Sequence, residues 1–225
     1  MSEVEEIEAR LAKQLEEYRS IIQGTDLYEY MGNRVVESRT TSGNLVAVKV
    51  NRKEDYRQSE AEMMQYAHGK RDPHTSEMRK HTQPYIGRIG NVTTYNFFDR
   101  LHNNDMGPFA SEEEFDEWCF ARVKFPYQQA FWKRYLPKMR KKSPSKFVLT
   151  HGDLSARNIM VQDGQLTGIV DWGYSGFFPE YMEYALATVI HESIEDWWLP
   201  VLKRVLEPSG YLRAKFIATI KDRGW

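Results

Sequence analysis

Two short apolar runs joined by a turn constrain this chain more than any other feature. A polar loop at 151–158 comes before the first apolar run, 159–161. A turn at 163–164 follows, and Asp171 comes directly after the second apolar run, 166–170. An Asp-Gly turn between apolar runs predicts a tight hairpin. Pairing of the two runs returns Asp171 to the side of Asn158. The pattern therefore predicts an amide and a carboxylate side by side, close to the carboxylate of Asp153.

These three side chains are the groups that phosphoryl transfer needs. The reaction is mainly a problem of positioning and charge neutralisation. Asp153 would orient an acceptor hydroxyl and take its proton, while Asn158 and Asp171 would offer Mg²⁺ the hard oxygen ligands that it prefers. Residues 151–153 and 171–173 also match the order of the kinase catalytic-loop and metal-aspartate motifs. The plain alternative is a surface loop followed by a hairpin.

Two longer motifs make the pattern more specific. Leu-Thr-His-Gly-Asp-Leu-Ser-Ala-Arg-Asn-Ile-Met-Val occupies 149–161, and Gly-Ile-Val-Asp-Trp-Gly occupies 168–173. The stretch 147–190 resembles the aminoglycoside phosphotransferase (choline kinase-like) family, in particular its fungal branch. Weaker similarity extends upstream, through Gln-Pro-Tyr-Ile-Gly-Arg-Ile-Gly at 83–90 and Gly-Pro-Phe at 107–109.

The resemblance implies an α+β, two-lobe protein kinase-like fold and ATP- and Mg²⁺-dependent phosphorylation of a hydroxyl on a small molecule. It implies that Asp153 is the catalytic base, that Asn158 and Asp171 are the Mg²⁺ ligands, and that His151 braces the loop. Arg157 has two open roles, because it would either assist charge neutralisation or anchor the loop.

The upstream segment 27–50 predicts an antiparallel meander, since its apolar stretches are separated by turn residues. Lys49 lies in Val-Ala-Val-Lys-Val, which resembles the kinase strand that offers a lysine to nucleotide phosphates. Glu60, on a helix predicted at 56–69, is the natural partner of that lysine. Together they predict a nucleotide-binding pair, and the alternative is a strand-end lysine with an exposed glutamate.

The organisation expected is an N-terminal helix in 1–24, an abridged kinase-like N-lobe in 25–82 and a helical C-lobe in 83–225. Residues 2–22 carry apolar side chains at steps of three and four, which predicts an amphipathic helix. The polar segment 69–84 is too short for two further buried strands. The N-lobe is therefore expected to lack part of its sheet and the hinge.

The C-lobe pattern predicts helices at 111–136, after Pro179 and from Trp197 onward. Ser111 begins a capping box, Phe125 belongs to the expected apolar face and Pro126 is expected to end or kink the first run. The basic segment 133–146 predicts a solvated helix end, with an anion or nucleic-acid site as the alternative. Acidic residues after the metal loop, Glu180 and Glu183 among them, form a candidate rim for a cationic acceptor or a plain solvated face.

Composition narrows the partners. The net charge is −1, which gives no general argument for nucleic-acid or membrane binding. A single cysteine, Cys119, excludes an internal disulfide and predicts a core position. No apolar run approaches the ~20 residues of a membrane-spanning helix, and the acidic start does not resemble a signal peptide. We therefore expect a cytoplasmic protein that binds a small-molecule acceptor, with no nucleic-acid or membrane partner.

Two other functions fit parts of the pattern. The shortened N-lobe is also expected of a catalytically weak pseudokinase that serves as a binding or scaffold module. A metal-dependent hydrolase built on His151, Asp153 and Asp171 would need more histidine ligands than this region has. The identity of the acceptor does not follow from the sequence, because a fold does not set a substrate.

Overall fold

In a computed structural model, the chain separates into two compact units, Met1–Arg57 and Gln58–Trp225. The structure describes residues 24–30, 33–50, 58–68, 78–98, 104–140, 146–162, 164–190, 197–206 and 211–221. The helix predicted at 2–22 and most of the polar segment 69–84 lie outside these residues. The division between the units falls at residue 57, and the predicted boundary at residue 82 stays a prediction.

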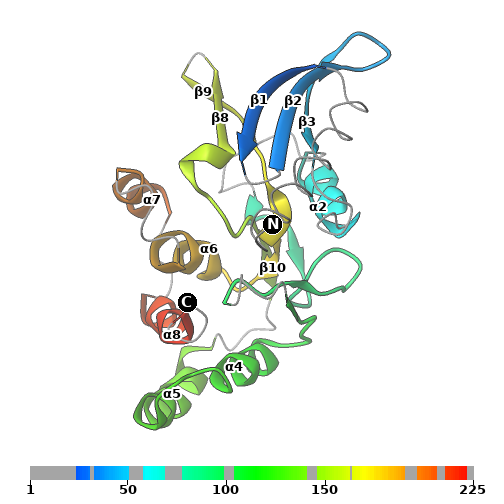
Figure 1. Ribbon diagram of the computed structural model, residues 1–225. Helices are drawn as coiled ribbons and strands as arrows, with labels where there is room; N and C mark the ends of the chain where they lie inside the picture. The colour runs from blue at the N-terminus through cyan, green and yellow to red at the C-terminus, as the bar shows by residue number, and fades with distance from the viewer. Residues whose placement is uncertain are drawn as a thin grey trace, which may run out of the picture. The chain divides into compact units, whose positions relative to one another are not determined.

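The first unit is the predicted meander. It contains β1 (Thr25–Tyr30), β2 (Asn33–Arg39) and β3 (Leu45–Val50), which pair antiparallel in that order (Figure 1). The turn before β3 closes through a hydrogen bond from Thr40 N to Asn44 O of 2.9 Å. Gly43 has φ 83° there, a conformation that glycine adopts without strain.

Three small sheets and the α2 helix form one part of the second unit. The elements are α2 (Gln58–His68), β4 (Thr82–Gln83), β5 (Thr94–Tyr95), β6 (Asp105–Met106), β7 (Phe147–Thr150), β8 (Ile159–Gln162), β9 (Gln165–Ile169) and β10 (Gly176–Phe178). The sheets are β10-β7-β4, β5-β6 and β8-β9. The central strand β7 is buried at all four residues and leads directly into the predicted catalytic loop.

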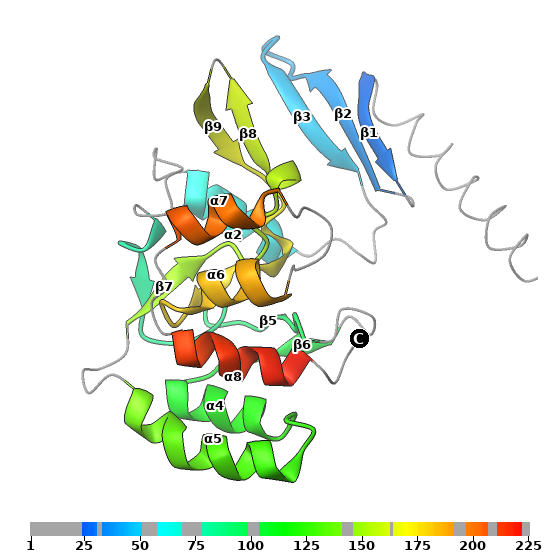
Figure 2. The ribbon, with the colours of Figure 1, turned by 90° about the vertical axis from the view of Figure 1, so that its left-hand side faces the viewer.

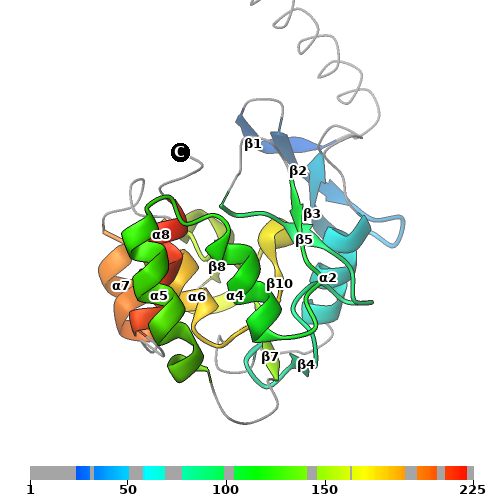
Figure 3. The same ribbon diagram turned by 90° about the horizontal axis from the view of Figure 1, so that it is seen from below.

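Helices form the rest of the second unit. They are α4 (Glu112–Phe120), α5 (Pro126–Met139), α6 (Met182–Ala185), which continues as a π-helical turn through Ile190, α7 (Leu199–Val205) and α8 (Tyr211–Lys221). In Figure 2, α8 lies over α4 and α4 over α5, and Figure 3 views the unit from that end. Among the described residues, no helix is long and apolar enough to cross a membrane.

Most of the sequence-predicted elements are confirmed, with two corrections near Pro126. Ser111 caps α4 by accepting a hydrogen bond of 3.1 Å from Glu114 N, as its pattern predicted. Pro126 does not end or kink one long helix. It begins α5, because the first position of a helix needs no N–H donor. Phe125 is 39 % exposed, so it is not part of the core.

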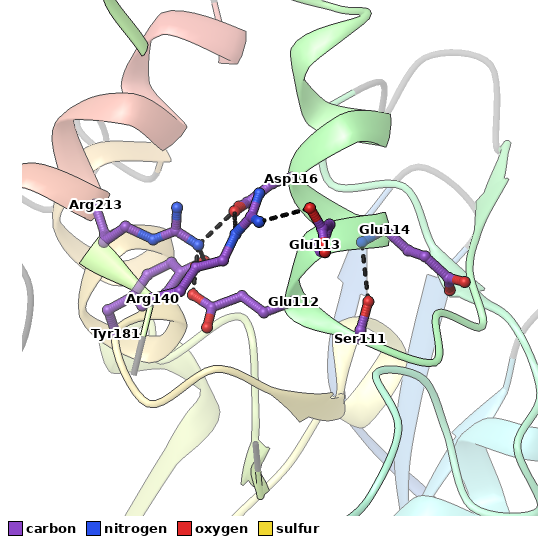
Figure 4. Close-up of polar contacts among 8 residues, drawn as sticks. All are labelled: Ser111, Glu112, Glu113, Glu114, Asp116, Arg140, Tyr181 and Arg213. Atoms are coloured by element: carbon purple, nitrogen blue, oxygen red, sulfur yellow. Dashed lines mark hydrogen bonds and ion pairs between the residues drawn. The ribbon is translucent and has the colours of Figure 1, made fainter. Parts of the chain in front are cut away.

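A buried cluster of charged side chains ties α8 to α4 (Figure 4). Arg213 of α8 donates through Nη2 to Glu112, to Asp116 Oδ1 at 2.7 Å and to the Tyr181 hydroxyl at 2.9 Å. Arg140 binds the other oxygen of Asp116 at 2.8 Å. Burial raises the pKa of Glu112 above its ordinary value. A buried charge without a partner lowers the stability of the fold, so the two arginines offset the cost of burying the two acids.

Candidate active site

The carboxylate of Asp153 is held in one orientation. It is 4 % exposed, on the loop that follows β7. The Ser155 hydroxyl donates to one carboxylate oxygen, and Arg157 Nη2 donates to the other at 3.0 Å. Side chains that fix an acidic group before a substrate arrives reduce the cost of positioning it later. Of the two roles predicted for Arg157, this contact favours anchoring.

His151 braces the loop from inside. Its ring is buried, and its Nδ1 accepts a hydrogen bond of 3.2 Å from Asp153 N. Nε2 lies 2.9 Å from Val170 O, and this contact makes Nε2 the protonated nitrogen of a neutral ring. Burial lowers the pKa of His151, which agrees with the neutral form. Because both nitrogens already face the backbone, His151 does not serve as the metal ligand that the hydrolase hypothesis requires.

The β8–β9 hairpin places Val170, the residue before Asp171, opposite Asn158. Ile159 pairs with Ile169, and Val170 N donates to Asn158 O at 2.9 Å. Asp171 follows with φ 64°, a left-handed conformation that is uncommon outside glycine. Such a conformation turns the chain sharply at the residue that carries the predicted metal ligand.

The donor set fits a hard divalent cation. The Asn158 amide donates through Nδ2 to Asp153 O at 2.9 Å, so its Oδ1 is the atom left to face a ligand. This amide oxygen and the Asp171 carboxylate are ligands of the type that Mg²⁺ prefers. Among the residues that the structure describes, no group of three or more His, Cys, Asp or Glu side chains gathers as a metal cluster. A site with two protein ligands leaves positions for phosphate oxygens.

Glu60 and the metal loop lie close together within the second unit. A methyl group placed on Gly173 would be 3.5 Å from Asp171 Oδ1 and 3.7 Å from Glu60 Oε2. The two carboxylates therefore flank one glycine. Lys49 is in β3, opposite Val35, in the first unit. The predicted pairing of Lys49 with Glu60 joins the two units and stays a prediction.

Arg88 fixes the metal loop, and the sequence interpretation assigned it no role. The side chain is fully buried. It donates to the carbonyl oxygens of Gly173 and, at 3.2 Å, of Ser175, and to the Ser59 hydroxyl of α2 at 2.6 Å. One guanidinium thus joins the metal loop to the helix that carries Glu60. The only sequence signal was its place in Gly-Arg-Ile-Gly at 87–90, within the weaker similarity.

Glu183 corrects a third expectation, because it is not on a substrate rim. It is 5 % exposed on α6, and its two oxygens accept hydrogen bonds from His151 N at 2.6 Å and Gly152 N at 3.1 Å. Burial raises its pKa from 4.5 to about 7, although the two backbone N–H groups oppose this effect. The Glu183 carboxylate therefore fixes the backbone of the catalytic loop by binding two successive N–H groups.

Gly152 lets the catalytic and metal loops touch through their backbones. Its φ is +84°, and a Cβ there would lie 2.6 Å from Tyr174 O. No side chain fits that space, so the loop needs glycine between His151 and Asp153. This contact accounts for His-Gly-Asp where many kinases have His-Arg-Asp.

Comparison with known proteins decides the family. The model of the phosphotransferase enzyme family, APH, matches residues 98–217, more than half of the chain. The chain belongs to this phosphotransferase family. The match contains the catalytic loop, the hairpin and the metal loop, and the mixed α+β class predicted for such a member is confirmed. The fungal branch stays a prediction.

One solved structure is also similar to this chain. It is a thermostable mutant of aminoglycoside phosphotransferase APH(4)-Ia in its apo form, with 14 % sequence identity and a TM-score of 0.46. The alignment covers 89 % of this chain and 84 % of that chain. The family assignment rests on the family match alone.

Proposed function

We propose that this chain transfers the γ-phosphoryl group of ATP to a hydroxyl of a small molecule in a Mg²⁺-dependent reaction. The observation that carries the proposal is the juxtaposition of Asp153 with Asn158 and Asp171. It lies within the family match and uses residues in the order that kinase motifs require.

Asp153 is the proposed catalytic base. Its carboxylate, oriented by Ser155 and Arg157, accepts the proton of the acceptor hydroxyl and keeps the attacking oxygen in line. General bases of this kind contribute about 10²–10⁴-fold to a rate. The side chains of His151 and Glu183 are bound to backbone N–H groups of the catalytic loop, so they act by holding the loop and not by contacting the substrate. They are positioning residues.

Asn158 Oδ1 and the Asp171 carboxylate would hold Mg²⁺, and the bound ion would neutralise charge on the phosphates. Lys49 is the proposed contact to the nucleotide phosphates, with Glu60 as its partner. Arg88 would keep Asp171 in place whether or not a nucleotide is bound, because its hydrogen bonds are made within the protein. The cytoplasm is the proposed location.

Thermal unfolding with MgATP and the turnover of an Asp153→Asn variant test the proposal. A ligand at a hundred times its Kd stabilises a protein by about 2.7 kcal/mol. We expect stabilisation of both proteins, and ATP consumption with a panel of hydroxyl-bearing metabolites only in the wild type. Asp105→Asn, an exposed change on β6, is the matched control and should keep full turnover.

Two results would count against the proposal. Full turnover of Asp153→Asn would remove Asp153 as the base. No stabilisation by millimolar MgATP would favour the second candidate, a binding or scaffold module, which the short polar segment 69–84 suggested from sequence.

A further inference from the structure

One side of α5 combines exposed aromatic and basic side chains. Its residues are three or four positions apart, which places them along one helical face. We call this the outer face of α5, and it consists of Tyr127, Phe131, Arg134, Tyr135 and Lys138, all exposed. The aromatic members Tyr127, Phe131 and Tyr135 are 69 %, 49 % and 37 % exposed. The opposite side buries Trp132 and Leu136 in the core, so the helix is fixed with its outer face toward solvent.

The exposed rings contact one another and nearby lysines. The ring centroids of Phe131 and Tyr135 are 4.6 Å apart. Lys138 Nζ lies 5.7 Å from the ring centroid of Tyr135, and Lys124 Nζ lies 5.4 Å from that of Phe125. The result is an exposed row of aromatic side chains along α5 with ammonium groups beside it. Soluble proteins rarely leave a large apolar strip uncovered without an interaction to explain it.

Charge is strongly segregated along the sequence at this helix. The stretch 118–152 holds nine of the 31 basic residues of the chain and none of its 32 acidic residues. The rest of the chain therefore has 22 basic against 32 acidic residues, a net charge of −10. Among the described residues, the ion pairs on this stretch use Arg140, and none uses the two basic residues of the outer face. The near-neutral total therefore hides a basic stretch of sequence that contains α5.

The position of α5 favours a broad, flat partner. Within the second unit, α4 and α8 pack on the inner side of α5, which lies at the edge of the unit (Figures 1 and 2). An edge helix presents a convex face. A plane fits such a face along its whole length, whereas a single nucleic-acid strand or an extended peptide is usually bound in a groove that encloses it.

We propose that the outer face of α5 binds an anionic lipid surface, with the helix lying flat in the headgroup region. Aromatic rings prefer this depth, and basic side chains are attracted to anionic headgroups. The inference does not depend on phosphotransfer. It replaces two sequence expectations, a plain solvated helix end and the absence of a membrane partner, because only the structure shows that the aromatic and basic residues share one exposed side.

Vesicle binding by the full chain tests the proposal. We expect sedimentation with vesicles of phosphatidylcholine and phosphatidylserine, no sedimentation with phosphatidylcholine alone, and release at high salt, which screens the attraction. Arg134→Glu with Lys138→Glu should weaken binding about tenfold or more. Tyr127→Ser with Phe131→Ser should weaken it without changing the net charge.

Lys203→Glu with Arg204→Glu on α7 is the matched control, since both residues are exposed and the net charge changes equally. It should bind like the wild type. Equal loss in the α7 and α5 variants would overturn the proposal, and so would no binding to phosphatidylserine vesicles at low salt. Tighter, α5-dependent binding of single-stranded RNA or of an acidic peptide would also overturn the choice of a lipid surface.

Discussion

The substitution Glu183→Gln separates two opposing effects on a buried carboxyl group. Burial raises its pKa from 4.5 to about 7, while the backbone N–H groups of His151 and Gly152 lower it. A carboxyl group whose pKa is higher in the folded than in the unfolded protein contributes to stability, and this contribution is complete at pH values below the pKa of the unfolded state. That contribution is lost as the pH rises through the folded pKa.

The size of the effect follows from the two pKa values. Between pH 4.5 and 7, the Glu183 contribution to the wild-type free energy of unfolding falls by about 3 kcal/mol. Glutamine does not titrate. Its amide also turns a donor toward one backbone N–H, which costs about 1–3 kcal/mol at every pH. The variant should therefore be less stable than the wild type by about 1–3 kcal/mol at pH 4.5. The difference should shift by about 3 kcal/mol in favour of the variant up to pH 7, so that it closes or reverses sign.

Urea unfolding followed by tryptophan fluorescence measures this gap. All six tryptophans lie in the second unit, so the signal reports on the unit that contains Glu183. His151 contributes with the opposite sign, because burial lowers its pKa, but it is present in both proteins and cancels in the difference. Glu117→Gln on the exposed side of α4 is the control for the change from glutamate to glutamine and should keep a stability close to that of the wild type. A gap that stays constant or widens for Glu183→Gln would refute the reasoning, since the two amides would then outweigh burial.

Three further substitutions test contacts that hold the site. Gly152→Ala should destabilise the protein by about 2 kcal/mol more than Gly164→Ala in urea unfolding. Both glycines have positive φ, but only Gly152 faces a backbone atom, Tyr174 O. Arg88→Met should cost about 1–3 kcal/mol of stability, because it leaves the carbonyl oxygen of Gly173 without its donor while that of Ser175 keeps Thr94, and should weaken stabilisation by MgATP. Arg213→Met should cost about 3–5 kcal/mol, because it leaves buried Glu112 without the arginine that it contacts and leaves Asp116 with Arg140 alone, and its loss of stability should be smaller at acid pH than at pH 7.

Local patterns made much of the site predictable. The turn at 163–164 has the chemistry of a tight hairpin, and it predicts the pairing of the two flanking strands. It does not predict the bulge between Met160 and Val161, which shifts the register by one residue before Ile159 pairs with Ile169. The capping box at Ser111 is local in the same way. The meander of the first unit also follows from its own apolar runs and turns.

The contacts that sequence reasoning missed are distant along the chain. Glu183 binds His151 across 32 residues, and Arg88 reaches Gly173 across 85. The residues next to either one in the sequence do not show whether its side chain is buried and bound to a loop or exposed to solvent. The outer face of α5 was missed for a different reason: periodicity indicates a helix, but it does not decide which of two partly aromatic sides the core covers.

The cluster around Arg213 has a consequence for how this protein is made. Arg213 comes 97 residues after Asp116 and 101 residues after Glu112. During synthesis, α4 therefore emerges long before its cationic partner on α8, and its inner acids must stay in water until then. The second unit cannot complete its core from a nascent chain that ends before α8. The apolar side of α4 therefore stays exposed to aggregation until α8 has been made.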